Sequence, residues 1–222
     1  MKKYSIIVLA NQISPRLVAA DEPFESKIIL TSHLIELIQK YKDAPSKVII
    51  INEKSLNEEV ERVIDESNFK VLKTTRHTKG ALATAALSLD LVNETDPIVI
   101  VPSNAKVGFD LAKFLSEMKH GGYAAGIVTL RSDNPNMSFV RSYQNVIVEI
   151  AEKRIIGKEA TAGIFYFKDR SSLVEAIGWA LVNQVTTNGE YYIAPALNYF
   201  LTQRLPIGRY RIGDEDYERI EY

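Results

Sequence analysis

Small polar side chains follow directly on an apolar stretch at Pro102-Ser103-Asn104. Such side chains could face a ligand, or they could cap the helix that comes next. Polar loops also follow the apolar stretches that end at Leu9 and Ile51. An open α/β sheet binds its ligands at the carboxyl ends of its parallel strands. The sequence therefore predicts a binding site where the loops after Leu9, Ile51 and Val101 converge.

Three features of the C-terminal half could also do chemistry, and each has a purely structural interpretation. Glu152-Lys153 places an acid beside a base, which by itself is typical of a solvent-exposed ion pair at a strand end. Gly163 lies in a strand-like stretch, where glycine marks a bulge, a packing gap or the close approach of a ligand. Glu190 could be the first-turn acid of a helix that begins near Asn188, since the helix dipole stabilises acids there. These residue types alone leave both interpretations open.

The composition argues against several classes of site and partner. The chain has no cysteine, which excludes disulfides, thiolate catalysis and cysteine metal sites and suits the cytosol. His33, His77 and His120 show no metal-ligand spacing, and only His77, beside Thr78 and Gly80, could line a pocket. With 27 basic and 28 acidic residues, the net charge of −1 predicts no nucleic-acid partner. No apolar run approaches the ~20 residues of a membrane-spanning helix, and no signal peptide is recognised. We therefore expect a cytoplasmic protein without membrane insertion.

Short β-branched runs alternate with amphipathic segments in the first 120 residues. The apolar runs at 4–10, 48–51 and 98–101 are typical of buried parallel strands. Apolar residues recur at helical spacing over 27–41, 56–65 and 80–92. This alternation predicts βαβ crossovers and parallel strands.

The pattern changes after Gly121-Gly122. Strand-like segments separated by short turns follow at 124–130, 138–142, 145–150 and 161–167. Helices are expected at 171–183 and 191–203, and a last strand at 207–212. The Tyr191-Tyr192 pair is assigned to core or oligomer contacts. We predict a Rossmann-like α/β fold, a single domain over 1–222 with a mainly parallel, mixed central sheet flanked by helices.

From Thr78 onward the order of segments resembles the sugar-phosphate nucleotidylyltransferase superfamily, which has a GT-A-like fold, especially its small members of surface-polysaccharide pathways. Residues 78–86 resemble the glycine-containing start of a helix that contacts the nucleotide. Residues 148–153 and 162–167 are similar to the strand that ends in Glu-Lys and to the glycine strand that shapes the sugar pocket. Asn188-Gly189-Glu190 is similar to the motif whose glutamate holds sugar hydroxyls. The resemblance implies a nucleotide-binding-like half, 1–120, and a sugar-phosphate-binding-like half, 121–222.

The resemblance also implies roles for individual residues. Nucleotide contacts fall on Ala10, Asn11, Gln12, Thr78 and Gly80. Catalytic phosphate contacts fall on Arg16, Lys27 and Lys153. Substrate contacts fall on Ser103, Asn104, Glu152, Gly163, Glu190 and Asn198. Arg16 and Lys27 could instead be ordinary surface cations.

The N-terminal half departs from the family pattern at residues that nucleotidylyl transfer normally uses. Residues 6–17 keep Arg16 but lack the family's glycines, which let backbone N–H groups approach a triphosphate. Asn104 and Arg211 stand where the family has its two carboxylate metal ligands, with Asp214 as a substitute if the shortened loop shifts. Because Mg²⁺ prefers charged oxygen ligands, Asn104 and Arg211 make a poor site. Mg²⁺ is thus a possible but doubtful cofactor, and Arg211 could pair with a phosphate in its place.

Two functions follow from this pattern. The first is an enzyme that couples a nucleoside triphosphate to a sugar phosphate, or a similar small phosphate, for polysaccharide biosynthesis. The second is a non-catalytic relative that keeps a phosphosugar pocket and acts as a binding or regulatory partner, because the C-terminal motifs are retained while the nucleotide and metal motifs are eroded. A glycosyltransferase of the related fold ranks last, since only Asp214-Glu215-Asp216 resembles its metal motif. The expected partners are a nucleotide and a sugar phosphate, and a homo-oligomer is compatible with the sequence.

Overall fold

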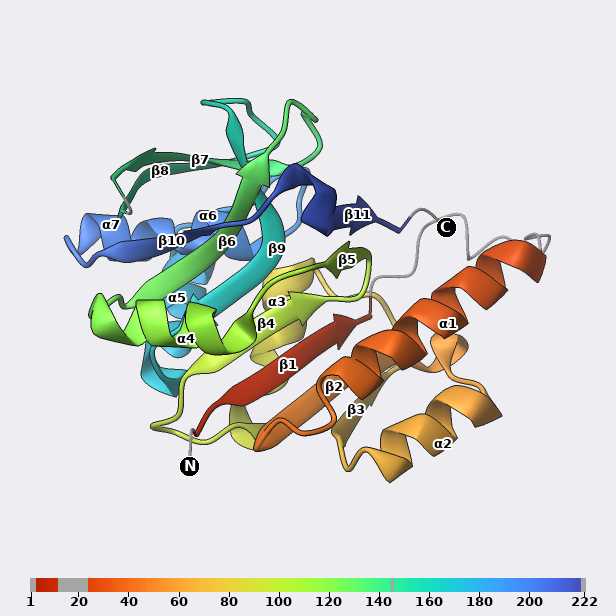
Figure 1. The fold of residues 1–222 in the computed structure, drawn as a ribbon. Helices are drawn as coiled ribbons and strands as arrows, with labels where there is room; N and C mark the ends of the chain where they lie inside the picture. Colours follow the sequence, from red (N-terminus) through yellow and green to blue (C-terminus); the bar gives the residue numbers. More distant parts are fainter. Residues whose placement is uncertain (1–2, 12–23, 145, 221–222) are drawn as a thin grey trace.

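The computed structural model describes residues 3–11, 24–144 and 146–220, with the side chains of 24–30 left aside. Figure 1 shows a twisted central sheet with helices on both of its faces. The sheet has a parallel half and a mostly antiparallel half, and the candidate site lies where the two meet.

Four parallel strands form the first half of the sheet. They lie in the order β3 (Lys70–Thr74), β2 (Ser46–Asn52), β1 (Ser5–Ala10) and β4 (Ile98–Pro102). Every residue of β1 is buried, as expected for a strand covered on both faces. The crossovers contain α1 (Phe24–Lys40), η2 (Glu53–Ser55), α2 (Glu58–Glu66), α3 (Ala81–Ala86) and η3 (Leu89–Leu91). The predicted βαβ alternation is confirmed.

The second half of the sheet is mostly antiparallel. β9 (Glu159–Phe167) runs antiparallel between β4 and β6 (Ala125–Arg131), and β10 (Ile207–Arg211) pairs parallel with β6. β8 (Val146–Glu152) and β7 (Ser138–Tyr143) complete the sheet with antiparallel pairings. The sheet is mixed, as predicted, but a mainly parallel sheet is not confirmed. The connection between β7 and β8 is too short for a parallel crossover, so this pair must run antiparallel. The antiparallel direction of β9 between β4 and β6 depends instead on which strands become neighbours in the sheet.

The helices bury two separate apolar cores against the two faces of the sheet. α1, α2 and α4 (Leu111–His120) cover one face, where the Phe114 ring makes edge contacts with Phe109, Tyr166 and Tyr210. The other face is covered by α3, α5 (Arg170–Val182), α6 (Ile193–Ala196) and α7 (Asn198–Thr202). Among the described residues, none of these helices is long and apolar enough to cross a bilayer.

A small second sheet lies beside the carboxyl end of β4. β5 (Ala105–Val107) pairs antiparallel with β11 (Tyr217–Arg219), which follows η4 (Asp214–Asp216). Figure 1 shows this C-terminal segment returning to lie next to β5. The sequence pattern predicts neither strand, because three residues are too few to show an apolar period.

The pattern also misses β3 and α4. β3 is an edge strand with no fully buried residue, so it lacks the apolar run of its neighbours. α4 does carry a sequence signal, since Asp110 caps it by accepting a 2.9 Å hydrogen bond from the Lys113 backbone N–H. The single helix predicted over 191–203 is divided at Leu197 into α6 and α7.

Candidate functional site

A cleft of about 1090 Å³ opens where the two halves of the sheet meet. Leu9 and Asn11 reach it from the end of β1, and Pro102 and Asn104 reach it from the end of β4. The third predicted loop contributes from beneath, because Asn52 is buried and its side-chain Nδ2 donates to the side-chain Oδ1 of Asn11 at 3.5 Å. A cleft therefore lies where the sequence predicts a binding site.

Lys153, Tyr192 and Glu190 form a hydrogen-bonded chain along one wall of this cleft. The Lys153 ammonium donates to the Tyr192 hydroxyl at 2.7 Å, and that hydroxyl donates to Glu190 Oε2, also at 2.7 Å. Lys153 Nζ lies 4.7 Å from the centroid of the Tyr192 ring, within cation–π range. Lys153 and Glu190 are 37 positions apart in the sequence, and Tyr192 joins them. Tyr192 therefore lines the cleft and not the core, whereas Tyr191 packs against the core as predicted.

Glu152 and Lys153 do not form the exposed ion pair that their adjacency suggests. The Glu152 carboxylate accepts a hydrogen bond from the Ser138 hydroxyl, on the neighbouring strand β7. Lys153 has a positive φ of 50°, and its backbone N–H donates to the Met137 carbonyl at 3.1 Å. The backbone turn after β8 thus sends the two side chains to different partners within one cleft.

Burial raises the pKa of Glu152 above its ordinary value of 4.5, while the Ser138 hydroxyl and the Lys153 charge lower it in part. A raised pKa means that protonated Glu152 stabilises the folded chain at acidic pH, and that this contribution is lost as pH rises through the folded-state pKa.

We therefore expect Glu152→Gln, which keeps a neutral side chain at every pH, to unfold less readily than the parent chain at pH 7. The advantage should disappear below the ordinary pKa of 4.5. Urea denaturation at a series of pH values measures the unfolding free energy of the parent chain and of the variant. Glu66→Gln, on the exposed side of α2, is the control. A constant difference between parent and variant across this pH range would contradict the raised pKa.

Two glycines allow the walls of the cleft to approach each other. Gly80 has φ = 99°, and a Cβ there would lie 2.4 Å from the Tyr191 carbonyl oxygen. The segments on either side are tied by hydrogen bonds from the Tyr191 N–H to the Lys79 carbonyl (2.8 Å) and from the Leu82 N–H to the Tyr191 carbonyl (3.0 Å). Gly163 has φ = 80°, and a Cβ there would lie 3.0 Å from Pro102 Cγ. Both backbones have conformations that side chains disfavour.

A group of hydroxyl and amide side chains forms the floor beneath α3. Asn11, only 2% exposed, contacts the Thr78 hydroxyl through its side-chain nitrogen at 3.4 Å and accepts a hydrogen bond from Thr74 through its oxygen. The hydroxyls of Thr78 and Thr84 contact each other and both donate to the Gly80 carbonyl, at 3.1 and 3.2 Å. The interactions fix the orientation of the loop that opens α3.

The structure brings most of the predicted site residues together. Those that line the cleft are Asn11, His77, Thr78, Gly80, Asn104, Glu152, Lys153, Gly163 and Glu190. Of the other predicted residues, Gln12 and Arg16 lie outside the described residues, and Lys27 belongs to α1 but its side chain is not described.

Four predicted residues lie elsewhere. Ala10 belongs to the core beneath α1, and Ser103 is buried with its N–H donating to the Leu9 carbonyl at 3.1 Å. The Asn198 side chain donates to the Ile150 carbonyl at 3.2 Å, which ties α7 to β8. Arg211 is half exposed and lies 3.9 Å from Glu159, so it does not line the cleft opposite Asn104.

The fold was compared with those of known proteins. The nucleoside-diphosphate-sugar pyrophosphorylase from Vibrio cholerae RC9 superposes with a TM-score of 0.77 at 17% identity, covering 97% of this chain and 95% of that one. The inositol-1-phosphate CTP transferase from T. maritima gives 0.67 at 17% identity, with 100% and 90% covered. A putative glucose-1-phosphate thymidylyltransferase from Bacillus anthracis, solved with a sucrose, gives 0.63 at 16% identity, with 94% and 87% covered. This chain has the sugar-phosphate nucleotidyltransferase fold. No family model matches its sequence, and no curated protein is significantly similar.

The family resemblance expected from the motifs is confirmed at the level of the nucleotidyltransferase fold. The side chains that this chain places near Asn104 are poor ligands for Mg²⁺. In residues 3–11, 24–144 and 146–220, no group of three or more histidine, aspartate or glutamate side chains could hold a metal ion. The proposed substitute ligand Asp214 instead accepts a 3.0 Å hydrogen bond from the Arg131 backbone N–H. The donor set around Asn104 therefore does not suit a hard divalent cation.

Sequence reasoning missed one cationic residue on this nucleotidyltransferase fold. Arg219 lines the cleft, because β11 pairs with β5 and sets Arg219 opposite Ala105, next to Asn104. The Ile220 N–H donates to the Asn104 carbonyl at 3.0 Å and extends that pairing. No motif marks Arg219, since its position depends on where the C-terminal segment folds back.

Proposed function

We propose that this chain is a sugar-phosphate nucleotidyltransferase that joins a nucleoside triphosphate to a sugar phosphate or a similar small phosphate. The observation that carries the proposal is the joining of Lys153, Tyr192 and Glu190 in one wall of the cleft, facing the loop of Thr78 and Gly80. A cation, a hydroxyl and a carboxylate in sequence suit a ligand that has both a phosphate and hydroxyl groups. The fold shared with three such proteins supports the same reaction class.

The two halves of the chain divide the substrates between them in this proposal. Residues 1–120 hold the nucleotide, with Asn11, Thr78 and Gly80 at its contact surface. Residues 121–222 hold the sugar phosphate, with Lys153 at the phosphate and Glu190 at sugar hydroxyls. Gly163 leaves room for the sugar ring, since a larger residue would press on Pro102.

The reaction needs little covalent chemistry from the protein. A phosphate oxygen of the sugar phosphate attacks the α-phosphorus of the triphosphate, the bond from that phosphorus to the bridging oxygen breaks, and pyrophosphate leaves. Catalysis then depends on alignment and on positive charge near the transferring group. Lys153 and Arg219 are the cations of the described cleft that supply such charge.

A broad substrate panel tests the reaction. Purified protein should release pyrophosphate from at least one pairing of the common nucleoside triphosphates with hexose, pentose or polyol phosphates. Arg219→Ala should reduce that rate by roughly tenfold or more, because it removes a charge-assisted hydrogen bond to phosphate. Arg204→Ala, after α7, is the matched control, since Arg204 does not line the cleft. A complete absence of pyrophosphate release across the panel would exclude the enzyme.

A second function, binding without turnover, is favoured by the missing acidic ligands. Asn104 lines the cleft with an amide where the family has a carboxylate, while Lys153, Tyr192 and Glu190 are joined in one wall. We propose that such a protein would bind a sugar phosphate or a nucleotide sugar independently of Mg²⁺. It would then act as a binding or regulatory partner in polysaccharide biosynthesis. Isothermal titration in EDTA separates it from the enzyme, which must also release pyrophosphate. If the protein neither binds these ligands in EDTA nor releases pyrophosphate, both proposed functions are excluded.

A further inference from the structure

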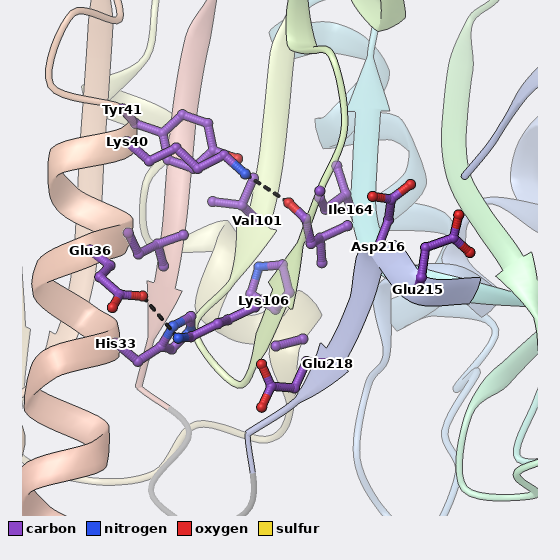
Figure 2. Close-up of a pocket in the computed structure, with 15 residues that line it drawn as sticks. His33, Glu36, Lys40, Tyr41, Val101, Lys106, Ile164, Glu215, Asp216 and Glu218 are labelled. Atoms are coloured by element: carbon purple, nitrogen blue, oxygen red, sulfur yellow. Dashed lines mark hydrogen bonds and ion pairs between the residues drawn. The ribbon is translucent and has the colours of Figure 1, made fainter. Parts of the chain in front are cut away.

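A second cavity of about 360 Å³ lies on the other side of the β4–β5 connection from the large cleft. Figure 2 shows it between α1, β5 and the C-terminal segment of η4 and β11. Its volume lies within the range of small-ligand pockets. Pro102 and Ala105 line both cavities, so the connection that carries Asn104 is a shared wall.

His33 supplies a polar group that the protein itself does not satisfy. This side chain is 4% exposed, and neither ring nitrogen has a hydrogen-bond partner. Burial lowers the pKa of His33, and the Lys106 charge lowers it further, while Glu36, the nearby Ser103 backbone and Glu218 offset this in part. The Ser103 backbone does not reach hydrogen-bond geometry with either ring nitrogen. The neutral ring offers one donor and one acceptor. Buried polar groups without partners are rare and usually signal a water, an ion or a ligand.

Both amines that line this cavity already have partners. Lys106 Nζ forms an ion pair with Glu36 at 3.0 Å, as the dashed line in Figure 2 shows. Lys40 Nζ donates to the Val107 carbonyl at 2.7 Å and lies 5.4 Å from the centroid of the Phe109 ring. The Glu36 carboxylate thus offsets the Lys106 charge, and the Lys40 ammonium is directed toward the Val107 carbonyl and the Phe109 ring.

Three carboxylates line the opposite side, Glu215, Asp216 and Glu218, and none of them forms an ion pair within the part of the chain that the structure describes. Asp216 accepts a 3.3 Å hydrogen bond from the Gly213 N–H, and Glu218 lies opposite Lys106 in the β5–β11 register. Figure 2 places Glu218 across the cavity from α1, beyond the Lys106 side chain. With Lys106 neutralised by Glu36, the three acids outnumber the remaining cation, Lys40. The cavity therefore favours a positive ligand.

Apolar side chains complete the walls. Leu37, Val101, Val107 and Ile164 line the interior between the polar groups. Such a mixture binds a small ligand with a compact apolar body and one charged end.

We propose that this cavity is a second binding site, specific for a small organic cation in which an ammonium group is attached to a compact apolar body. The ammonium lies toward Glu215 and Glu218, the apolar body packs on Val101 and Ile164, and His33 completes the polar contacts. β11 links this site to the cleft, because Glu218 lines the second cavity while its neighbours Tyr217 and Arg219 line the first.

Phenethylammonium serves as the probe, and 2-phenylethanol and phenylacetate serve as its neutral and anionic counterparts. Titration of the full chain, followed by NMR, should give saturable shifts at His33, Ile164 and Glu218 with phenethylammonium. The neutral and anionic compounds should bind more weakly. Glu215→Gln combined with Glu218→Gln should weaken phenethylammonium binding about fivefold, because each exposed ion pair contributes modestly. Both positions are exposed, so the fold should tolerate the change.

Glu66→Gln on α2 is the matched control and should leave the affinity unchanged. The proposal is overturned if phenethylammonium causes no saturable shift at His33, if phenylacetate binds as well, or if the control weakens binding as much as the double variant. None of these outcomes depends on nucleotidyl transfer, so the second site and the proposed reaction fail independently.

Discussion

Replacement of Lys153 by alanine is expected to weaken sugar-phosphate binding in the large cleft roughly 10- to 100-fold, since hydrogen bonds to charged groups contribute about 1.5–3 kcal/mol. The Lys153 ammonium lies in the wall of the cleft and donates a hydrogen bond to the Tyr192 hydroxyl at 2.7 Å. A phosphate can approach the remaining donors of the ammonium. Its removal also leaves Tyr192 bonded to Glu190 alone.

Calorimetric titration with a sugar phosphate measures this loss, and two companion variants identify its origin. Tyr192→Phe should weaken binding by a smaller factor, because it removes the bridge but keeps the charge. Lys113→Ala on the exposed face of α4 is the matched control and should change nothing. Equal affinity of Lys153→Ala and the parent chain would remove Lys153 from the phosphate site. A loss as large in Lys113→Ala would indicate a general charge effect instead.

Gly80→Ala is expected to cost about 3 kcal/mol of unfolding free energy, through a disfavoured backbone and a direct clash. At φ = 99° and ψ = 172°, Gly80 occupies a region that is almost restricted to glycine. A Cβ there would lie 2.4 Å from a backbone oxygen, which cannot move aside as a flexible side chain can. Relief of the clash would break the hydrogen bonds between the Lys79–Leu82 backbone and Tyr191. The variant should therefore also lose ligand binding in the cleft.

Gly178→Ala provides the contrasting substitution for this measurement. Gly178 lies in α5 with nothing within 4 Å of the added Cβ, so alanine should stabilise the chain by about 0.5–1 kcal/mol through helix propensity. Urea denaturation of both variants compares the two glycines directly. If Gly80→Ala were as stable as Gly178→Ala, the backbone at Gly80 would not lie as close to Tyr191 as the structure places it.

Elements with a strong local pattern could be predicted from the sequence. β1, β2 and β4 are continuous apolar runs, and the C-terminal strands alternate with clear turns, so each was expected within a few residues of its position. β3, β5 and β11 were missed because an exposed edge strand and two three-residue strands have no such pattern. The balance of parallel and antiparallel pairing was also missed, because it depends on which strands become neighbours.

The candidate site divides in the same way. Sequence motifs identified Glu152-Lys153, Gly163 and Glu190, and each lines the cleft. Asn198 and Ser103 matched the same motifs, yet they make backbone contacts away from the cleft. A motif gives the position of a residue in the chain, whereas the direction of its side chain depends on the strand register around it.

By itself, the sequence determined the order of the elements with a strong apolar pattern, the two-part character of the sheet and the carboxyl end of β1 and β4 as the place of the cleft. These features follow from local periodicity and from the rules that connect parallel strands. Only the tertiary structure decided that Tyr192 bridges Lys153 and Glu190, that Arg219 rather than Arg211 reaches the cleft, and that His33 faces a second cavity. Those contacts join segments far apart in the chain. Their geometry is set by packing and strand pairing, which no local pattern records.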